Sequence, residues 1–149
     1  MNGIIWDKIR ALVTNGCNYR CPFCHNEGQE KGAAVSYMTF DEFKQLVELL
    51  KNQPISEFII SGGETFLHKD IVKMIIHACT TLNSDISCAT NLSLINDAAI
   101  GQLSGTRVKF NIQFPYFSEL LFAKSTGTGS LSKILDKISR VKAAGIEIG

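Results

Sequence analysis

The hydrophobic positions along this chain follow two different periods. Short segments rich in apolar and β-branched residues are typical of strands buried on at least one face. Five such segments are predicted to be strands: residues 9–14, 57–61, 85–90, 107–114 and 146–148. Gly62 and Gly63 end the second of them, and Pro115 ends the fourth.

Longer segments between these strands repeat their apolar residues every three or four positions, which predicts amphipathic helices. The clearest covers residues 39–51, where Thr39 and Glu42 form a capping-box signature at the start. A last helix is expected to begin after Ser130, whose side chain would cap it, and to end at Gly145. The remaining predictions are helices at residues 70–79 and 96–103 and a helical turn at 116–124.

Strands and helices alternate along the chain, which indicates βαβ units and a parallel sheet of the α/β class. Because such crossovers are right-handed, all helices are expected on one side if the sheet curls. A chain of 149 residues suits one domain with a real core. Residues 146–148 begin a strand at the end of the chain, so we expect an incomplete domain whose open sheet edge favours self-association.

Composition narrows the range of partners. A formal net charge of +1 gives no electrostatic reason to expect nucleic acid or an anionic membrane surface. No run of about 18 apolar residues predicts a membrane-spanning helix. Residues 1–10 lack the basic start and continuous apolar run of a signal peptide. We therefore expect a cytoplasmic protein in a reducing compartment.

Three of the five cysteines lie in one short loop after the first predicted strand. Cys17, Cys21 and Cys24 have the spacing Cys-x3-Cys-x2-Cys. A disulfide framework would space its cysteines more widely, whereas crowded thiolates hold iron–sulfur clusters or zinc. Zinc would need a fourth ligand, and the adjacent His25 is poorly placed to provide it. We favour a four-iron cluster with one open iron, and zinc or a chance grouping of thiols are the alternatives.

This loop resembles the signature of the radical S-adenosylmethionine (SAM) superfamily, Cys-x3-Cys-x-aromatic-Cys, with Phe23 at the aromatic position. The resemblance implies a 4Fe-4S cluster whose open iron binds SAM. An external flavodoxin-like or ferredoxin-like donor would supply one electron, and SAM would be cleaved to methionine and a 5′-deoxyadenosyl radical. Phe23 is expected beside the adenine. The resemblance also implies a partial (βα)6 barrel, so that residues 1–149 would be a radical SAM core that stops at its fifth strand.

A second motif follows the second predicted strand. Gly62, Gly63 and Glu64 resemble the Gly-Gly-Glu motif of the superfamily, whose backbone and carboxylate bind the SAM amino group. An ammonium suits carbonyl oxygens and a carboxylate. Many members have a proline next, where this chain has Thr65. By itself a glycine pair after a strand is a turn, and its place after the cysteine loop supports the functional interpretation.

Other positions match the superfamily less specifically. Thr90 and Asn91 resemble a Thr-Asn-Gly stretch, but Leu92 replaces the glycine, so that a different turn is expected. Asn111 and Gln113 alternate with apolar residues on the fourth strand and should point into the barrel, where relatives hold SAM. Lys124 precedes a Thr-Gly loop where relatives often carry a base for the SAM carboxylate, although a surface lysine is the alternative.

The sequence therefore predicts the core of a radical SAM enzyme that abstracts hydrogen from an unknown small molecule, peptide or protein. The layout resembles activating enzymes of glycyl-radical proteins and the branch that modifies peptides or makes the molybdenum cofactor. The alternative is a non-catalytic domain that keeps an iron–sulfur or zinc site for structure, partner binding or electron transfer.

Overall fold

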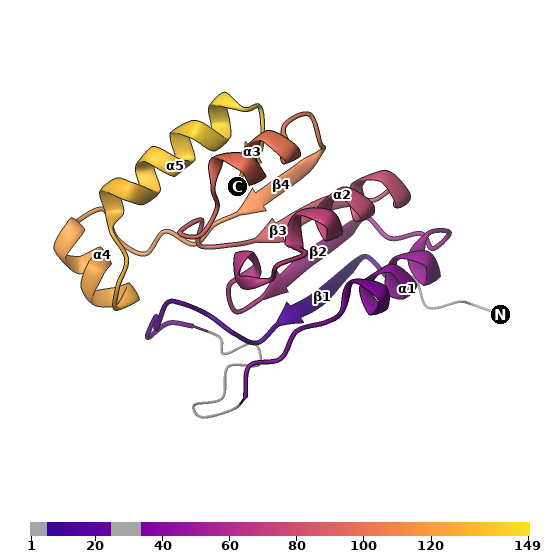
Figure 1. The fold of residues 1–149 in the computed structure, drawn as a ribbon, viewed down its shortest axis with the longest axis horizontal. Helices are drawn as coiled ribbons and strands as arrows, with labels where there is room; N and C mark the ends of the chain where they lie inside the picture. The colour runs from indigo at the N-terminus through magenta and orange to yellow at the C-terminus, as the bar shows by residue number, and fades with distance from the viewer. Residues whose placement is uncertain (1–5, 25–33) are drawn as a thin grey trace.

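The computed structural model describes residues 6–24 and 34–149. Five strands alternate with helices along the chain (Figure 1). The strands are β1 (Lys8–Thr14), β2 (Glu57–Gly62), β3 (Asp85–Ala89), β4 (Val108–Asn111) and β5 (Glu147–Ile148). The helices are α1 (Phe40–Leu50), η1 (Thr65–Leu67), α2 (Ile71–Thr81), α3 (Asp97–Leu103), α4 (Glu119–Thr126) and α5 (Leu131–Ala143).

The strands form one parallel sheet in the order β1-β2-β3-β4-β5. Each strand pairs with the next one along the chain, which is how a (βα) barrel is wound. Within the described residues β1 and β5 each pair on one side only, so the sheet is open and corresponds to part of a barrel. The predicted α/β class and parallel order are confirmed.

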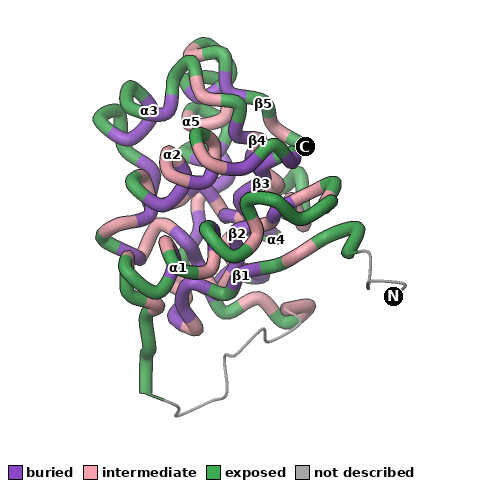
Figure 2. Tube along the Cα trace, turned by 90° about the vertical axis from the view of Figure 1, so that its right-hand side faces the viewer, coloured by how far each residue is buried: buried purple, intermediate pink, exposed green. Residues whose placement is uncertain are grey.

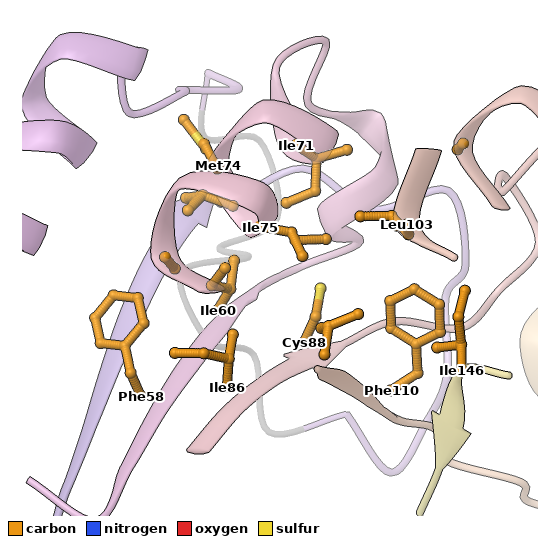
Figure 3. Close-up of a cluster of buried hydrophobic side chains, with 14 of the residues drawn as sticks. Phe58, Ile60, Ile71, Met74, Ile75, Ile86, Cys88, Leu103, Phe110 and Ile146 are labelled. Carbon is orange, nitrogen blue, oxygen red and sulfur yellow. The ribbon is translucent and has the colours of Figure 1, made fainter. Parts of the chain in front are cut away.

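The apolar core is built from residues of the strands and of the helices packed on them, and Figure 2 marks the buried positions along the chain in purple. Side chains on β2, β3 and β4 point toward α2, whose Met74 and Ile75 are fully buried (Figure 3). The largest of these strand side chains are Phe58 and Phe110, both fully buried. Each contributes about 1.5–3 kcal/mol by leaving water, so this layer stabilises the packing of α2 on the sheet.

The opposite face of the sheet is largely polar. Lys8 on β1 forms an ion pair with Glu57 on β2 at 3.0 Å, and Ser87 on β3 donates a hydrogen bond to Glu57 at 2.8 Å. Lys109 on β4 pairs with Glu147 on β5, also at 3.0 Å. These side chains alternate with core residues along each strand. The inner face therefore suits a polar ligand better than a second apolar layer.

The fourth strand is shorter than the predicted 107–114. It ends at Asn111, and Phe114 beyond it packs against a second apolar cluster. The Phe114 ring lies tilted against Phe117 and Phe122, with ring centroids 5.1 Å and 5.7 Å apart. Its ring is thus used in tertiary packing against α4, and Gln113 lies beyond the strand.

The prediction that the Ser130 side chain caps the last helix is also wrong. Ser130 occupies the N-cap position of α5 but makes no capping hydrogen bond. Glu119 of α4 takes that role, because its carboxylate accepts hydrogen bonds from the backbone N–H groups of Leu131 at 3.1 Å and Ser132 at 3.0 Å. A carboxylate at a helix N-terminus is favoured by the helix dipole, and this contact ties α4 to α5.

The turn after β3 has an unusual backbone at Leu92, where the resembled stretch has glycine. Leu92 has φ 60°, the left-handed region that favours glycine. Its side chain is fully buried in the main core. Burial of the leucine side chain offsets the backbone strain at this position; that the turn differs from that of relatives with glycine stays a prediction.

Two substitutions at Leu92 test this balance. Leu92→Ala keeps the strain and loses the buried side chain, so it should lower the free energy of unfolding by about 2–5 kcal/mol. Leu92→Gly loses the same side chain but relieves strain of about 1 kcal/mol. The glycine variant should therefore be the more stable of the two in urea unfolding, the reverse of the usual order of alanine and glycine. An alanine variant more stable than the glycine variant would contradict the strained turn.

The cap of α5 should make stability depend on pH. Hydrogen bonds from the backbone of Ser132 and Leu131 and from Ser130 lower the pKa of Glu119, most strongly that from Ser132. The contribution of Glu119 to the stability of the fold is therefore present above its unfolded pKa. It is lost as the pH falls through the lower folded pKa. Glu119→Gln should lower the urea midpoint at pH 7, and its difference from wild type should shrink below about pH 4. Ser139→Ala is the control: this exposed serine of the same helix donates to the carbonyl of Leu135 and does not contact Glu119, so its difference from wild type should not change with pH.

Candidate functional site

A cavity of about 270 Å³ lies at the carboxyl end of the sheet, where α/β folds build their sites. Its walls come from the cysteine loop after β1, the end of β2, the turn after β3 and the segment after β4. Most of the predicted site residues line it: Cys17, Cys21, Phe23, Cys24, Gly62, Gly63, Thr90, Asn111 and Gln113. The fold thus brings together residues that lie far apart in the sequence.

The three cysteines are half-buried and face this one cavity. The backbone N–H of Tyr19 donates to Cys17 Sγ at 3.4 Å, and the N–H of Cys24 donates to the carbonyl of Cys21 at 3.1 Å. Burial raises the pKa of the Cys21 thiol, and the neighbouring thiols of Cys17 and Cys24 raise it further. A bound cation would favour the thiolate forms in such a group.

The donor set agrees with a cluster that has three protein ligands. In the described ranges, no three His, Cys, Asp or Glu side chains are placed to hold one metal ion. A cluster makes a different demand, because each of its cysteine ligands binds a different iron. Three thiols around one cavity, with further polar backbone beside them, fit a 4Fe-4S cluster together with a ligand on the fourth iron.

The glycine pair places the end of β2 against the end of β1. A Cβ atom on Gly62 would lie 2.4 Å from the carbonyl oxygen of Thr14, and Gly62 has φ 155°. The N–H of Gly63 donates to that same oxygen at 3.0 Å, and the N–H of Glu64 donates to the carbonyl of Gly16 at 2.7 Å. Glycine at position 62 therefore serves a close approach between two backbones, beside the cysteine loop.

The carboxylate of Glu64 is turned away from the cavity. Glu64 is fully buried and accepts hydrogen bonds from Thr90 Oγ1 at 2.6 Å, the N–H of Asn91 at 2.6 Å and the N–H of Phe66 at 3.0 Å. Burial raises its pKa, and these three hydrogen bonds oppose that rise. With these contacts Glu64 holds the turn after β3 and the start of η1 in place, and its predicted contact with the SAM amino group stays a prediction.

The remaining predicted residues divide into two groups. Asn111 lies on the inner face of β4, and Gln113 reaches the same cavity from the segment after the strand. Lys124 is exposed in the last turn of α4 and does not line the cavity. Lys124 therefore lies apart from the predicted site residues that line the cavity.

Sequence reasoning missed several polar residues in or beside this cavity, among them Arg10 and Asn18. Arg10 on β1 lines the cavity; its alternation with Ile9 and Ala11 could have placed it on the inner face. Asn18, between the first two cysteines, binds the turn after β3 by its side chain. No periodic signal marks Asn18, because its partners lie 73 and 75 residues away.

Comparisons with known proteins agree with this geometry. The family profile of the radical SAM superfamily matches residues 11–149. A "GTP 3',8-cyclase" from Peptoclostridium acidaminophilum is 30% identical over 141 residues, covering 93% of this chain and 43% of that protein. A "Probable GTP 3',8-cyclase" from Sulfolobus acidocaldarius is 27% identical over 141 residues, covering 94% and 44%. The chain thus spans less than half the length of these relatives.

Solved structures show the same fold. Streptococcus suis SuiB bound to S-adenosylmethionine superposes with a TM-score of 0.83 at 14% identity, over 97% of this chain and 33% of that one. The protein anSMEcpe with bound AdoMet gives a TM-score of 0.76 at 17% identity, over 97% and 42%. Because the profile match covers nearly the whole chain, including the cysteine loop, this chain belongs to the radical SAM superfamily, whose members bind a 4Fe-4S cluster and SAM.

Proposed function

We propose that Cys17, Cys21 and Cys24 hold a 4Fe-4S cluster and that the cavity beside them binds SAM for reductive cleavage. The observation that carries this proposal is the meeting of the three thiols with Phe23 and the Gly62–Gly63 backbone around one cavity. When bound and reduced, such a cluster supplies the electron that splits SAM into methionine and a 5′-deoxyadenosyl radical.

The chain's own groups have distinct tasks in this proposal. Phe23 offers an aromatic surface for the adenine, and carbonyl groups beside Gly62 and Gly63 suit the ammonium of SAM. Asn111 and Gln113 provide amide groups for the remaining polar atoms of SAM. Glu64 acts indirectly, because it holds Thr90 and Asn91 at the wall of the cavity.

For the substrate we favour a nucleoside triphosphate such as GTP. Relatives at 27% and 30% identity are named as GTP 3',8-cyclases. Arg10 faces the cavity from β1, and a guanidinium suits phosphate oxygens. SuiB and anSMEcpe have been solved with peptides, so a peptide is the competing substrate. An external flavodoxin-like or ferredoxin-like protein would supply the electron.

No helix in residues 6–24 and 34–149 has the length and apolar character needed to cross a bilayer.

The proposed cluster can be tested on the full-length protein after anaerobic reconstitution with iron and sulfide. Wild type should bind about four irons and, with dithionite and SAM, release methionine and 5′-deoxyadenosine. Cys21→Ala should reduce 5′-deoxyadenosine formation at least about 100-fold, because a cluster ligand is lost and even outer contacts are worth 10–100-fold. Iron analysis and chromatography with mass detection give both readouts.

Cys79→Ala is the matched control, because Cys79 is half-buried on α2 and does not line the cavity. It should keep both the iron content and SAM cleavage. Zinc bound at one ion per chain without iron uptake would overturn the cluster assignment. A complete cluster without SAM cleavage would instead favour the electron-transfer or structural alternative. Consumption of GTP, or of a peptide, by the active protein decides between the two substrate classes.

A further inference from the structure

Asn18 takes part in a closed ring of side-chain hydrogen bonds that joins the cysteine loop to the turn after β3. Asn91 Nδ2 donates to Asn18 Oδ1 at 3.0 Å, and Asn18 Nδ2 donates to Ser93 Oγ at 2.8 Å. Ser93 Oγ donates in turn to Asn91 Oδ1 at 2.6 Å. Each of the three side chains both donates and accepts within the ring, so the hydrogen bonds polarise one another.

The turn that completes this ring is itself fixed from two other sides. The backbone N–H of Asn91 donates to the buried Glu64 carboxylate at 2.6 Å. Lys137 of α5 donates to the carbonyl oxygens of Ser93 and Ile95. The ring therefore connects the cysteine loop to a turn that Glu64 and Lys137 already hold in place.

The other side of the cysteine loop rests on the α4–α5 connection. The N–H of Arg20 donates to the carbonyl of Thr126 at 3.0 Å, and Thr128 Oγ1 donates to the carbonyl of Asn18 at 3.4 Å. A Cβ atom on Gly129 would lie 2.9 Å from the Tyr19 hydroxyl, so the loop packs closely there. Asn18 is thus held by its side chain on one side and by its carbonyl on the other.

We propose that Asn18 is a positioning residue that holds the cysteine loop in the conformation needed to receive the cluster and keeps the cluster bound. This inference rests on the proposed cluster at Cys17, Cys21 and Cys24. Asn18 directly follows Cys17, so loss of the ring frees the loop at its first ligand. The loop must then be ordered when the cluster binds, and that ordering cost weakens retention of the cluster.

The test uses full-length reconstituted protein and the rate of iron release to an excess of a ferrous chelator without oxygen. Asn18→Ala should release iron about 10-fold faster than wild type, as expected for loss of a residue that orients metal ligands. Asn91→Ala should also release iron faster than wild type. The double variant should be little faster than either single one, because both substitutions open the same ring.

Asn96→Ala is the matched control. Asn96 is an exposed asparagine whose Oδ1 accepts from the N–H of Ala99 at 2.9 Å and caps α3, away from the loop. It should lower the melting temperature while leaving iron release at the wild-type rate. If Asn18→Ala releases iron no faster than Asn96→Ala, or if the effects of Asn18→Ala and Asn91→Ala simply multiply, the proposal is overturned.

Ser93→Ala removes another member of the same ring. It is the variant to measure if Asn18→Ala does not fold. It must accelerate iron release in the same direction, and a wild-type rate in this variant would contradict the proposal. The proposed function fails differently: wild-type protein would then bind no cluster, or would bind it without cleaving SAM, before any variant is compared.

Discussion

The site depends on the buried carboxylate of Glu64, which joins segments that the sequence separates. Its backbone N–H binds the carbonyl of Gly16, and its two carboxylate oxygens bind the turn after β3 and the start of η1. A fully buried carboxylate is costly unless donors satisfy it, so three donors must stay in place for the fold to tolerate it. This requirement fixes the end of β2, η1 and the wall of the cavity relative to one another.

The two faces of the sheet have different roles: one packs against the helices, and the other carries the polar groups near the site. Large apolar side chains such as Phe58 and Phe110 fill the helix side, whereas Glu57, Lys109 and Asn111 alternate with them on the inner side. Because a strand's side chains alternate, each residue that packs the core sets the direction of an inner-face neighbour. The core therefore determines where polar groups stand at the cavity, although it does not contact the cavity itself.

The cysteine loop has little regular structure of its own and is held by contacts from two directions. The turn after β3 holds the Asn18 side chain, and α4 contacts Tyr19 through Phe122 and Arg20 through the carbonyl of Thr126. Glu119 joins α4 to α5, so the support on that side is continuous. A loop ordered in this way needs less rearrangement when a cluster binds, which favours affinity.

The sequence by itself determined the five-strand parallel pattern, the capping box at Thr39 and the grouping of Cys17, Cys21 and Cys24, because these features depend on local spacing. The tertiary structure alone decided the role of Glu64, the capping of α5 by Glu119, the early end of β4 and the ring at Asn18. Each of these is a polar or packing contact between residues distant in sequence, and no periodicity along the chain encodes such a pairing. Burial and hydrogen-bond satisfaction select these partners only when the elements have packed.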